Sequence, residues 1–229
     1  FTYSIGNFST LRCLEQIRND ICYHDNDVTV ITVGAGFSYG QLGISHFATE
    51  DISILRALPN ITIDSPSDIF EAESLMPQLM KVKGPKYLRI DKSSASYSSS
   101  ENVILGKARR CREGFDAVIF GTGGILKEAY LAADILSNKG ISLRVVSIHT
   151  IKPIDKDEII DAIVNIGYIF TLEEHTIVGG LGSAIAEIAI ENNPKPKLFK
   201  RFGIPDQFPS IVGDQFYLRQ IFELDANSI

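Results

Sequence analysis

The chain has 229 residues, 45% of them hydrophobic, which is enough for one large or two small domains with buried cores. Its 22 Lys and Arg residues against 28 Asp and Glu residues give a net charge of −6 without a long basic run, which argues against nucleic acid as a partner. No apolar run is long enough to span a membrane and no signal-peptide pattern is present, so we expect a cytoplasmic protein without a membrane contact.

The first part of the chain alternates helices and strands. Apolar residues recur at helical spacing across residues 9–23, which predicts an amphipathic helix. The β-branched run 28–33 predicts a strand buried on both faces. Thr49, followed by two acids, is expected to cap a helix that ends at Pro59. The remaining elements predicted here are a strand at 60–66, a helix at 68–80 and a strand at 86–90.

A serine-rich stretch then interrupts the alternation and is expected to be a linker. Beyond it the alternating order resumes and predicts a second α/β unit. Strands are predicted at 116–122, 141–149, 168–174 and 197–203, and helices at 125–140, 155–164, 182–193 and 213–225. The predicted fold class is therefore α/β, with two doubly wound α/β domains, each around a mostly parallel sheet.

Three glycine-bearing segments are candidates for a site. His46 follows a glycine-rich approach and precedes the helix predicted after Thr49, which indicates a polar ligand site or a packed core histidine. The segment 120–124, "FGTGG", lacks the GxGxxG spacing of a dinucleotide site, so Gly123 and Gly124 are predicted to serve a tight turn and close helix–sheet packing. The segment 172–187, "LEEHTIVGGLGSAIAE", places a strand, acids, His175, glycines and a helix in a row, and it is interpreted as a turn with a glycine-lined packing contact. The three cysteines are scattered without a CxxC pair and predict neither a disulfide framework nor a metal site.

Four motifs in order resemble the C-terminal half of a transketolase-type thiamin diphosphate enzyme. They are "EQIRND" at 15–20, "GQLGISHFATEDISILRALPNITIDSPSD" at 40–68, "GPKYLRIDK" at 84–92 and "LEEHTIVGGLGSAIAE" at 172–187. The resemblance implies a pyrimidine-binding domain over 1–92 that is incomplete at its N-terminus. A Ser-rich linker at 93–103 and the family's C-terminal domain at 104–229, which carries no cofactor, would follow.

The resemblance also assigns roles to residues. The histidine of the family's "G-x-(T/S)-H-x-x-x-E-D" loop matches His46 and contacts the carbonyl or first hydroxyl of the donor sugar. Phe8 is the candidate that stacks on the cofactor's pyrimidine ring, with Tyr3 beside it as the alternative. Lys92 stands where many relatives have an arginine, and it either meets the substrate phosphate or is a solvated lysine.

Two departures from the family pattern concern the substrate. Leu42 stands where transketolases usually have a hydroxyl-binding aspartate, and Gly34 stands where many carry a histidine. A buried leucine cannot bind a hydroxyl group, so the substrate is expected to be altered or less hydroxylated.

The family's catalytic glutamate and its diphosphate and magnesium sites do not match any residue of this chain. We therefore expect contact with the pyrimidine end of thiamin diphosphate only, no metal ligand, and no activity of the chain alone. The expected partner is a diphosphate-binding N-terminal domain or subunit, in a homodimer or heterotetramer.

The predicted function is a transferase of carbohydrate metabolism that moves a two-carbon ketol unit between sugar phosphates. Two alternatives share the fold: a deoxyxylulose phosphate synthase and the beta subunit of a 2-oxo acid dehydrogenase. A third alternative is a non-catalytic assembly module, which Leu42 and Gly34 favour.

Overall fold

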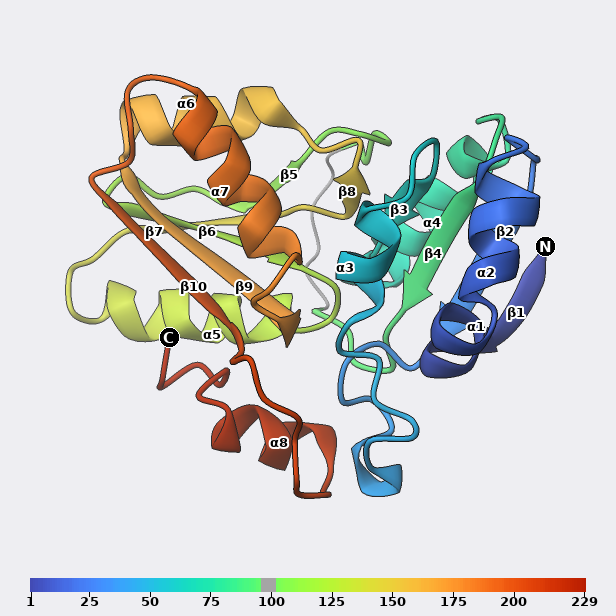
Figure 1. Cartoon of the computed structure of the whole chain (residues 1–229). Coiled ribbons are helices and arrows are strands. Elements are labelled where there is room, and N and C mark those ends of the chain that lie inside the picture. Colours follow the sequence, from blue (N-terminus) through green and yellow to red (C-terminus); the bar gives the residue numbers. More distant parts are fainter. Residues whose placement is uncertain (96–101) are drawn as a thin grey trace.

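Two sheets lie side by side in the computed structural model, which describes residues 1–95 and 102–229 (Figure 1). The first sheet contains, in spatial order, β1 (Thr2–Ile5), β2 (Thr29–Val33), β4 (Lys86–Ile90), β3 (Thr62–Asp64) and β8 (Thr150–Lys152). The second contains β10 (Leu198–Ile204), β9 (Tyr168–Thr176), β6 (Ala117–Thr122), β7 (Leu143–Ser147) and β5 (Arg109–Arg112).

Every neighbouring pair of these strands is parallel except β8 on β3 and β5 on β7. The prediction of an α/β fold with two mostly parallel sheets is confirmed. The predicted linker at 93–103 falls largely on residues 96–101, which lie outside the described part of the chain.

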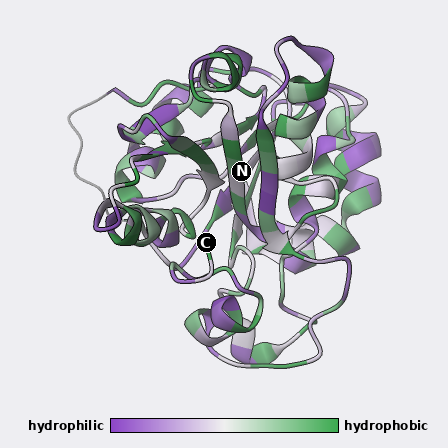
Figure 2. Cartoon of the chain, turned by 90° about the vertical axis from the view of Figure 1, so that its left-hand side faces the viewer, coloured by the Kyte–Doolittle hydropathy of each residue, from purple (hydrophilic) through white to green (hydrophobic). Residues whose placement is uncertain are grey.

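The helices cover these sheets. They are α1 (Gly6–Arg12), α2 (Leu14–Gln16), the π-helical turn η1 (Ile17–Cys22), the 3₁₀ turn η2 (Gly40–Leu42), α3 (Asp51–Arg56), α4 (Ile69–Leu79), α5 (Leu126–Ser137), α6 (Lys156–Asn165), α7 (Leu181–Glu191) and α8 (Gln215–Ile221). Figure 2 shows polar and apolar residues alternating along the helices, the pattern of helices with one buried face. No helix of the described residues has the length and apolar character needed to cross a bilayer.

The second sheet is buried on both faces, by α6 and α7 on one side and by α5 on the other. Two residues from the first half of the chain, Phe37 and Phe47, belong to the apolar cluster on the α5 side, together with Leu218 of α8. The ring of Phe37 stacks on Phe222 with centroids 5.3 Å apart. Burying a phenylalanine side chain stabilises a fold by about 1.5–3 kcal/mol, so this contact holds the loop after β2 against the second half of the chain.

The structure differs from the predicted elements at several points. The helix predicted over 9–23 divides into α1, α2 and η1, where Tyr23 N donates to Arg18 O in a π-type turn. Thr49 does not cap α3: its hydroxyl donates to the Glu50 carboxylate at 2.8 Å, and Glu50 holds the cap position.

The strands β1, β5 and β8 were not predicted. β5 reads "RRCR", which lacks an apolar alternation, and its arginines are instead paired with acids on α4 and α6. β8 has three residues and joins the first sheet from the second half of the chain.

Candidate functional site

The candidate site lies at the carboxyl edge of the first sheet. Because β1, β2 and β4 are parallel neighbours, their carboxyl ends meet at one edge. Phe8 lies in α1 directly after β1, His46 lies in the loop after β2, and Lys92 follows β4. Open α/β sheets bind ligands at such an edge. The topology therefore brings three of the four predicted site residues to one place.

These three residues form a chain of contacts in which Phe8 lies against His46, and His46 and Lys92 both lie against Tyr39. The rings of Phe8 and His46 have centroids 5.1 Å apart at 59°, and the rings of Tyr39 and His46 have centroids 6.2 Å apart. The ammonium of Lys92 lies 3.7 Å from the centroid of the Tyr39 ring. Sequence reasoning missed Tyr39 because no motif marks an aromatic residue in this loop.

Tyr3 is not part of this cluster. It lies on β1, an edge strand, and is 70% exposed. Phe8 is half-buried, with the Arg12 guanidinium 4.4 Å from the centroid of its ring. Of the two aromatic candidates, Phe8 is therefore the one with an ordered place beside His46.

The backbone and Nδ1 of His46 are held locally. Its N–H donates to Gly43 O at 2.9 Å, and its Nδ1 lies 2.9 Å from the Ser45 hydroxyl. Asn7 of α1 donates to Ser45 O at 2.6 Å, which ties the loop to the helix that carries Phe8. Nε2 has no hydrogen-bond partner within residues 1–95 and 102–229, so the structure leaves this nitrogen available for a ligand.

Glu174 anchors the His46 loop to the second half of the chain. Its Oε1 accepts from the Phe37 N–H at 2.6 Å and from Gln215 Nε2 at 2.8 Å, and its Oε2 is paired with Arg219 Nε. Burial raises the pKa of Glu174, and the charge of Arg219 opposes that rise. Gly36 has φ +54°, and a Cβ there would lie 2.5 Å from Glu174 Oε1, so only glycine allows this approach.

Asp91 makes a second anchor, next to Lys92. It accepts from the Ser38 hydroxyl at 2.8 Å and from Gln215 at 3.1 Å. The end of β4 and the loop after β2 thus share partners on α8. The partners in this network lie 41 to 137 residues apart in the chain and cannot be paired from one sequence, which is why the network was not predicted.

Beneath the site lies a buried ion pair between Arg89 and Asp51. Both side chains are about 1% exposed, and Arg89 Nε donates to Asp51 Oδ2 at 2.8 Å. Tyr87 donates to the same oxygen at 2.6 Å, while Arg89 Nη2 donates to Ala48 O at 2.8 Å. These bonds fix the segment between His46 and α3.

His175, the histidine of "LEEH", is a structural residue at the junction of the two halves. Its Nε2 accepts from Ser53 N–H at 3.3 Å and its Nδ1 lies 2.8 Å from Thr176 O, which assigns the neutral tautomer with the proton on Nδ1. Burial lowers the pKa of His175 to about 4, so it stays neutral near pH 7. The predicted glycine-lined contact lies further along the motif, at Gly179, where a Cβ would lie 2.7 Å from Ser53 Cβ.

Gly123 and Gly124 of "FGTGG" lie in a turn, as predicted, but Gly124 packs against Ser93, which belongs to neither a helix nor a strand. Gly123 has φ +74°, and a Cβ at Gly124 would lie 2.3 Å from Ser93 Oγ. Leu42, in contrast, was expected to be buried and is 55% exposed. It therefore lies on the surface beside His46.

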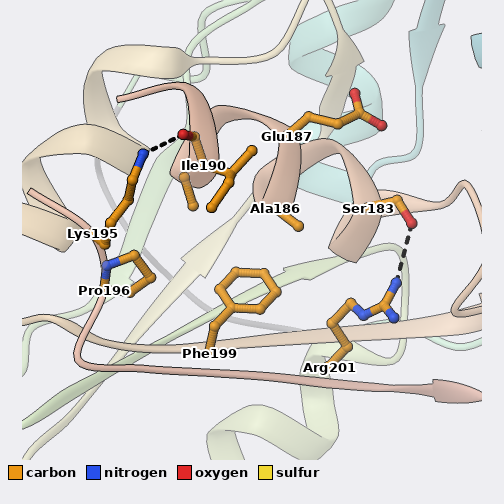
Figure 3. A pocket seen from close by; sticks show the side chains of 9 residues that line it. Ser183, Ala186, Glu187, Ile190, Lys195, Pro196, Phe199 and Arg201 are labelled. Carbon is orange, nitrogen blue, oxygen red and sulfur yellow. Dashed lines mark hydrogen bonds between the residues drawn. The ribbon is translucent and has the colours of Figure 1, made fainter. Parts of the chain in front are cut away.

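Other features of the described residues lie elsewhere. No group of three or more His, Cys, Asp and Glu side chains within them is placed to hold a metal ion. A cavity of about 800 Å³ lies between α7 and β10 and is lined by residues such as Ala186 and Phe199, with Arg201 donating to Ser183 Oγ (Figure 3). None of the four predicted site residues lines it.

Comparison with known proteins extends over both halves of the chain. The family model described as "Transketolase, pyrimidine binding domain" matches residues 1–96, and the one described as "Transketolase, C-terminal domain" matches residues 106–229. The chain belongs to the transketolase family. This family depends on thiamin diphosphate, and its pyrimidine-binding domain is named for one end of that cofactor.

Transketolase subunits are similar to the chain over its whole length. The 6-deoxy-6-sulfo-D-fructose transketolase subunit SqwH of Clostridium sp. (strain MSTE9) is 36% identical and covers 100% of this chain, which spans 71% of that protein. A subunit of the apulose-4-phosphate transketolase of Actinobacillus succinogenes is 31% identical, with coverages of 100% and 74%.

A solved structure described as a split gene transketolase, inactive beta4 tetramer, superposes with a TM-score of 0.86. It is 30% identical, and the match covers 99% of this chain and 71% of that one. The chain thus corresponds to the C-terminal portion of a transketolase-like protein.

Proposed function

We propose that this chain supplies the pyrimidine-binding wall and the donor-sugar contact of an enzyme that transfers a two-carbon ketol unit between sugar phosphates. The convergence of Phe8, His46 and Lys92 at one sheet edge carries this proposal. The pyrimidine-binding domain would extend over 1–92 and the C-terminal domain over 104–229. Between them, residues 93–103 would form the linker.

Phe8 is the residue that would contact the pyrimidine ring of thiamin diphosphate. An aromatic face gives rigid apolar contact to a flat ring, and the half-buried Phe8 offers such a face beside His46. When bound, the cofactor supplies an electron sink for cleavage of a carbon–carbon bond. The diphosphate and magnesium would be held by a domain outside this chain.

His46 would contact the oxygen at the reacting end of the donor sugar. Its Nδ1 is engaged by Ser45, which leaves Nε2 to donate to or accept from that oxygen. A positioned imidazole can follow the change in charge on an oxygen as a neighbouring bond breaks. Lys92, whose ammonium lies against the Tyr39 ring, would meet the anionic end of the sugar.

The site would be completed by a diphosphate-binding domain or subunit, in a homodimer or a heterotetramer. Exposed apolar side chains beside His46 support this proposal. Leu42 and Ile44 in the loop are 55% and 50% exposed, and Val212 and Phe216 near α8 are 59% and 58% exposed. The two segments touch, since Gly213 N donates to Gly40 O. Exposed apolar side chains gathered in this way mark surfaces that bind other proteins.

The test is ketol transfer by the chain assembled with its diphosphate-binding partner. We expect product from xylulose phosphate plus ribose phosphate, and a fall in kcat of about a hundredfold or more for His46→Ala. His24→Ala is the matched control, because His24 is an exposed histidine outside the cluster, and it is expected to change kcat by less than twofold.

Two outcomes would contradict the proposal. Product from pyruvate plus glyceraldehyde phosphate alone would assign the synthase reaction instead. A stable assembly that binds no thiamin diphosphate would assign a non-catalytic module.

A further inference from the structure

Tyr39 lies between the two residues proposed to contact the substrate. Its half-buried ring faces His46 on one side, with centroids 6.2 Å apart, and carries the Lys92 ammonium at 3.7 Å. Its hydroxyl has no hydrogen-bond partner in the part of the chain that the structure describes. The contacts of Tyr39 with these two groups are therefore made by its ring.

Gly34 provides the space for this ring. A Cβ at Gly34 would lie 2.3 Å from Tyr39 Cε2 and 2.4 Å from Cδ2, which is closer than side chains approach one another. Gly34 also has φ +95°, a conformation that favours glycine. The departure from the family's histidine at this position is thus coupled to Tyr39, whose ring occupies the place where another side chain would begin.

Lys92 is free of carboxylate partners within the described residues. Lys86, by comparison, pairs with Asp27 at 2.5 Å and donates to Val82 O and Gly84 O. An exposed lysine that rests on an aromatic face keeps its positive charge available, whereas one paired with an acid does not. The attraction between an ammonium and an aromatic ring, about 0.5–2 kcal/mol, restricts a side chain that is otherwise flexible.

We propose that Tyr39 is a positioning residue that holds the Lys92 ammonium for the anionic end of the sugar substrate, at a fixed place relative to His46. The ligand class is a sugar that ends in a tetrahedral oxyanion, either a phosphate or a sulfonate. This proposal rests on the proposed function and adds to it the residue that sets the distance between the two substrate contacts.

The first test compares donors in the complete enzyme. Tyr39→Leu removes the ring and is expected to raise KM for a phosphorylated ketose about three- to tenfold, with little change in kcat and none in KM for a ketose without an anionic group. Tyr39→Phe keeps the ring and is expected to keep the wild-type KM. Tyr23→Leu is the matched control, because Tyr23 also lies against a histidine, His24, but is 82% exposed and outside the cluster.

Lys92→Met tests whether Tyr39 acts through Lys92 or contacts the substrate itself. If Tyr39 acts through Lys92, then Tyr39→Leu changes KM no further once Lys92 is methionine. A phosphate-ended and a sulfonate-ended ketose, assayed in parallel, identify which oxyanion the site takes. An unchanged KM for Tyr39→Leu, or a loss of equal size for Tyr39→Phe, would overturn the proposal.

A second readout does not depend on activity. In the assembled protein with ¹³C-labelled lysine, the Lys92 side-chain resonances are expected to be displaced by the Tyr39 ring, to move on addition of inorganic phosphate, and to lose both effects in Tyr39→Leu. If these effects are seen without ketol transfer, the proposed function fails and Tyr39 keeps its role. If ketol transfer is seen without them, the role of Tyr39 fails alone.

Discussion

At the scale of single residues, the site depends on charges that the fold buries in pairs. Arg89 and Asp51 are each about 1% exposed, and Arg89 donates to Ala48 O, just after His46, and to Glu174 O on β9. Burying a charge costs free energy because the charge loses its contact with water. The partner charge offsets this cost only while it is present.

Arg89→Met should lower the free energy of unfolding by about 3–5 kcal/mol, because it leaves the Asp51 carboxylate buried without its counter-charge. Denaturant unfolding measures this loss. The double variant Asp51→Leu with Arg89→Met should recover much of it, since no lone charge remains. A loss below about 1 kcal/mol for the single variant would show that Asp51 is not charged in the folded protein.

Some residues of the candidate site can be predicted from the sequence, and others cannot. His46 was selected because it stands in one of the four motifs, and Phe8 because it lies before "EQIRND"; the roles of both residues stay predictions. Tyr39 could not, because its role depends on the space left by Gly34 and on Lys92, 53 positions along the chain. Glu174 was predicted only as the end of a strand, because its partners Gln215 and Arg219 lie on α8, about 40 residues further along the chain.

At the scale of elements, β8 connects the halves of the chain by pairing with β3. Thr150 donates to Asp64 Oδ1 at 2.7 Å, and Asp64 has no exposed surface. Burial raises the pKa of Asp64 to about 7, and the Thr150 hydrogen bond opposes this rise.

The stability of this junction should depend on pH. In the unfolded chain Asp64 loses its proton near its ordinary pKa of about 3.9, while in the folded chain it keeps the proton up to about pH 7. The free energy of unfolding should therefore fall as the pH rises through this window, by up to roughly 1.4 kcal/mol per unit, and level off above it. Asp64→Asn removes this pH-dependent contribution to stability. The melting temperature of the variant minus that of the wild type should therefore be larger at pH 8 than at pH 5.

The exposed Asp206→Asn serves as the control and should show no such dependence. If the melting temperatures of the wild type and Asp64→Asn changed by the same amount between pH 5 and pH 8, this would contradict a protonated Asp64.

Strands with a clear apolar pattern were predictable and short or charged ones were not. β4 coincides with its prediction, because "KYLRI" is bounded by a proline and an aspartate. β5 and β8 form only because the folded chain supplies partners, namely acids for the arginines of β5 and a sheet edge for β8. The residues of such strands form no local sequence pattern that predicts a strand.

At the scale of the whole molecule, the residues of the candidate site belong to the first half of the chain, and the second half anchors them. Phe37 and Phe47 insert into the core beside α5. Glu174, which is itself bound by Gln215 and Arg219, accepts from the Phe37 N–H. The C-terminal portion, which has no predicted site residue of its own, thereby fixes the position of His46. We therefore expect both halves of the chain to be needed for the proposed ligand site.

The most direct test of the central claim is the affinity of the assembled enzyme for thiamin diphosphate with wild-type and Phe8→Leu chains. We predict stoichiometric binding to the wild-type assembly and a dissociation constant raised about tenfold by Phe8→Leu, with no change for the control Phe115→Leu on an exposed loop. Equal affinity of the wild-type and Phe8→Leu assemblies, or an assembly that binds no cofactor, would contradict the account.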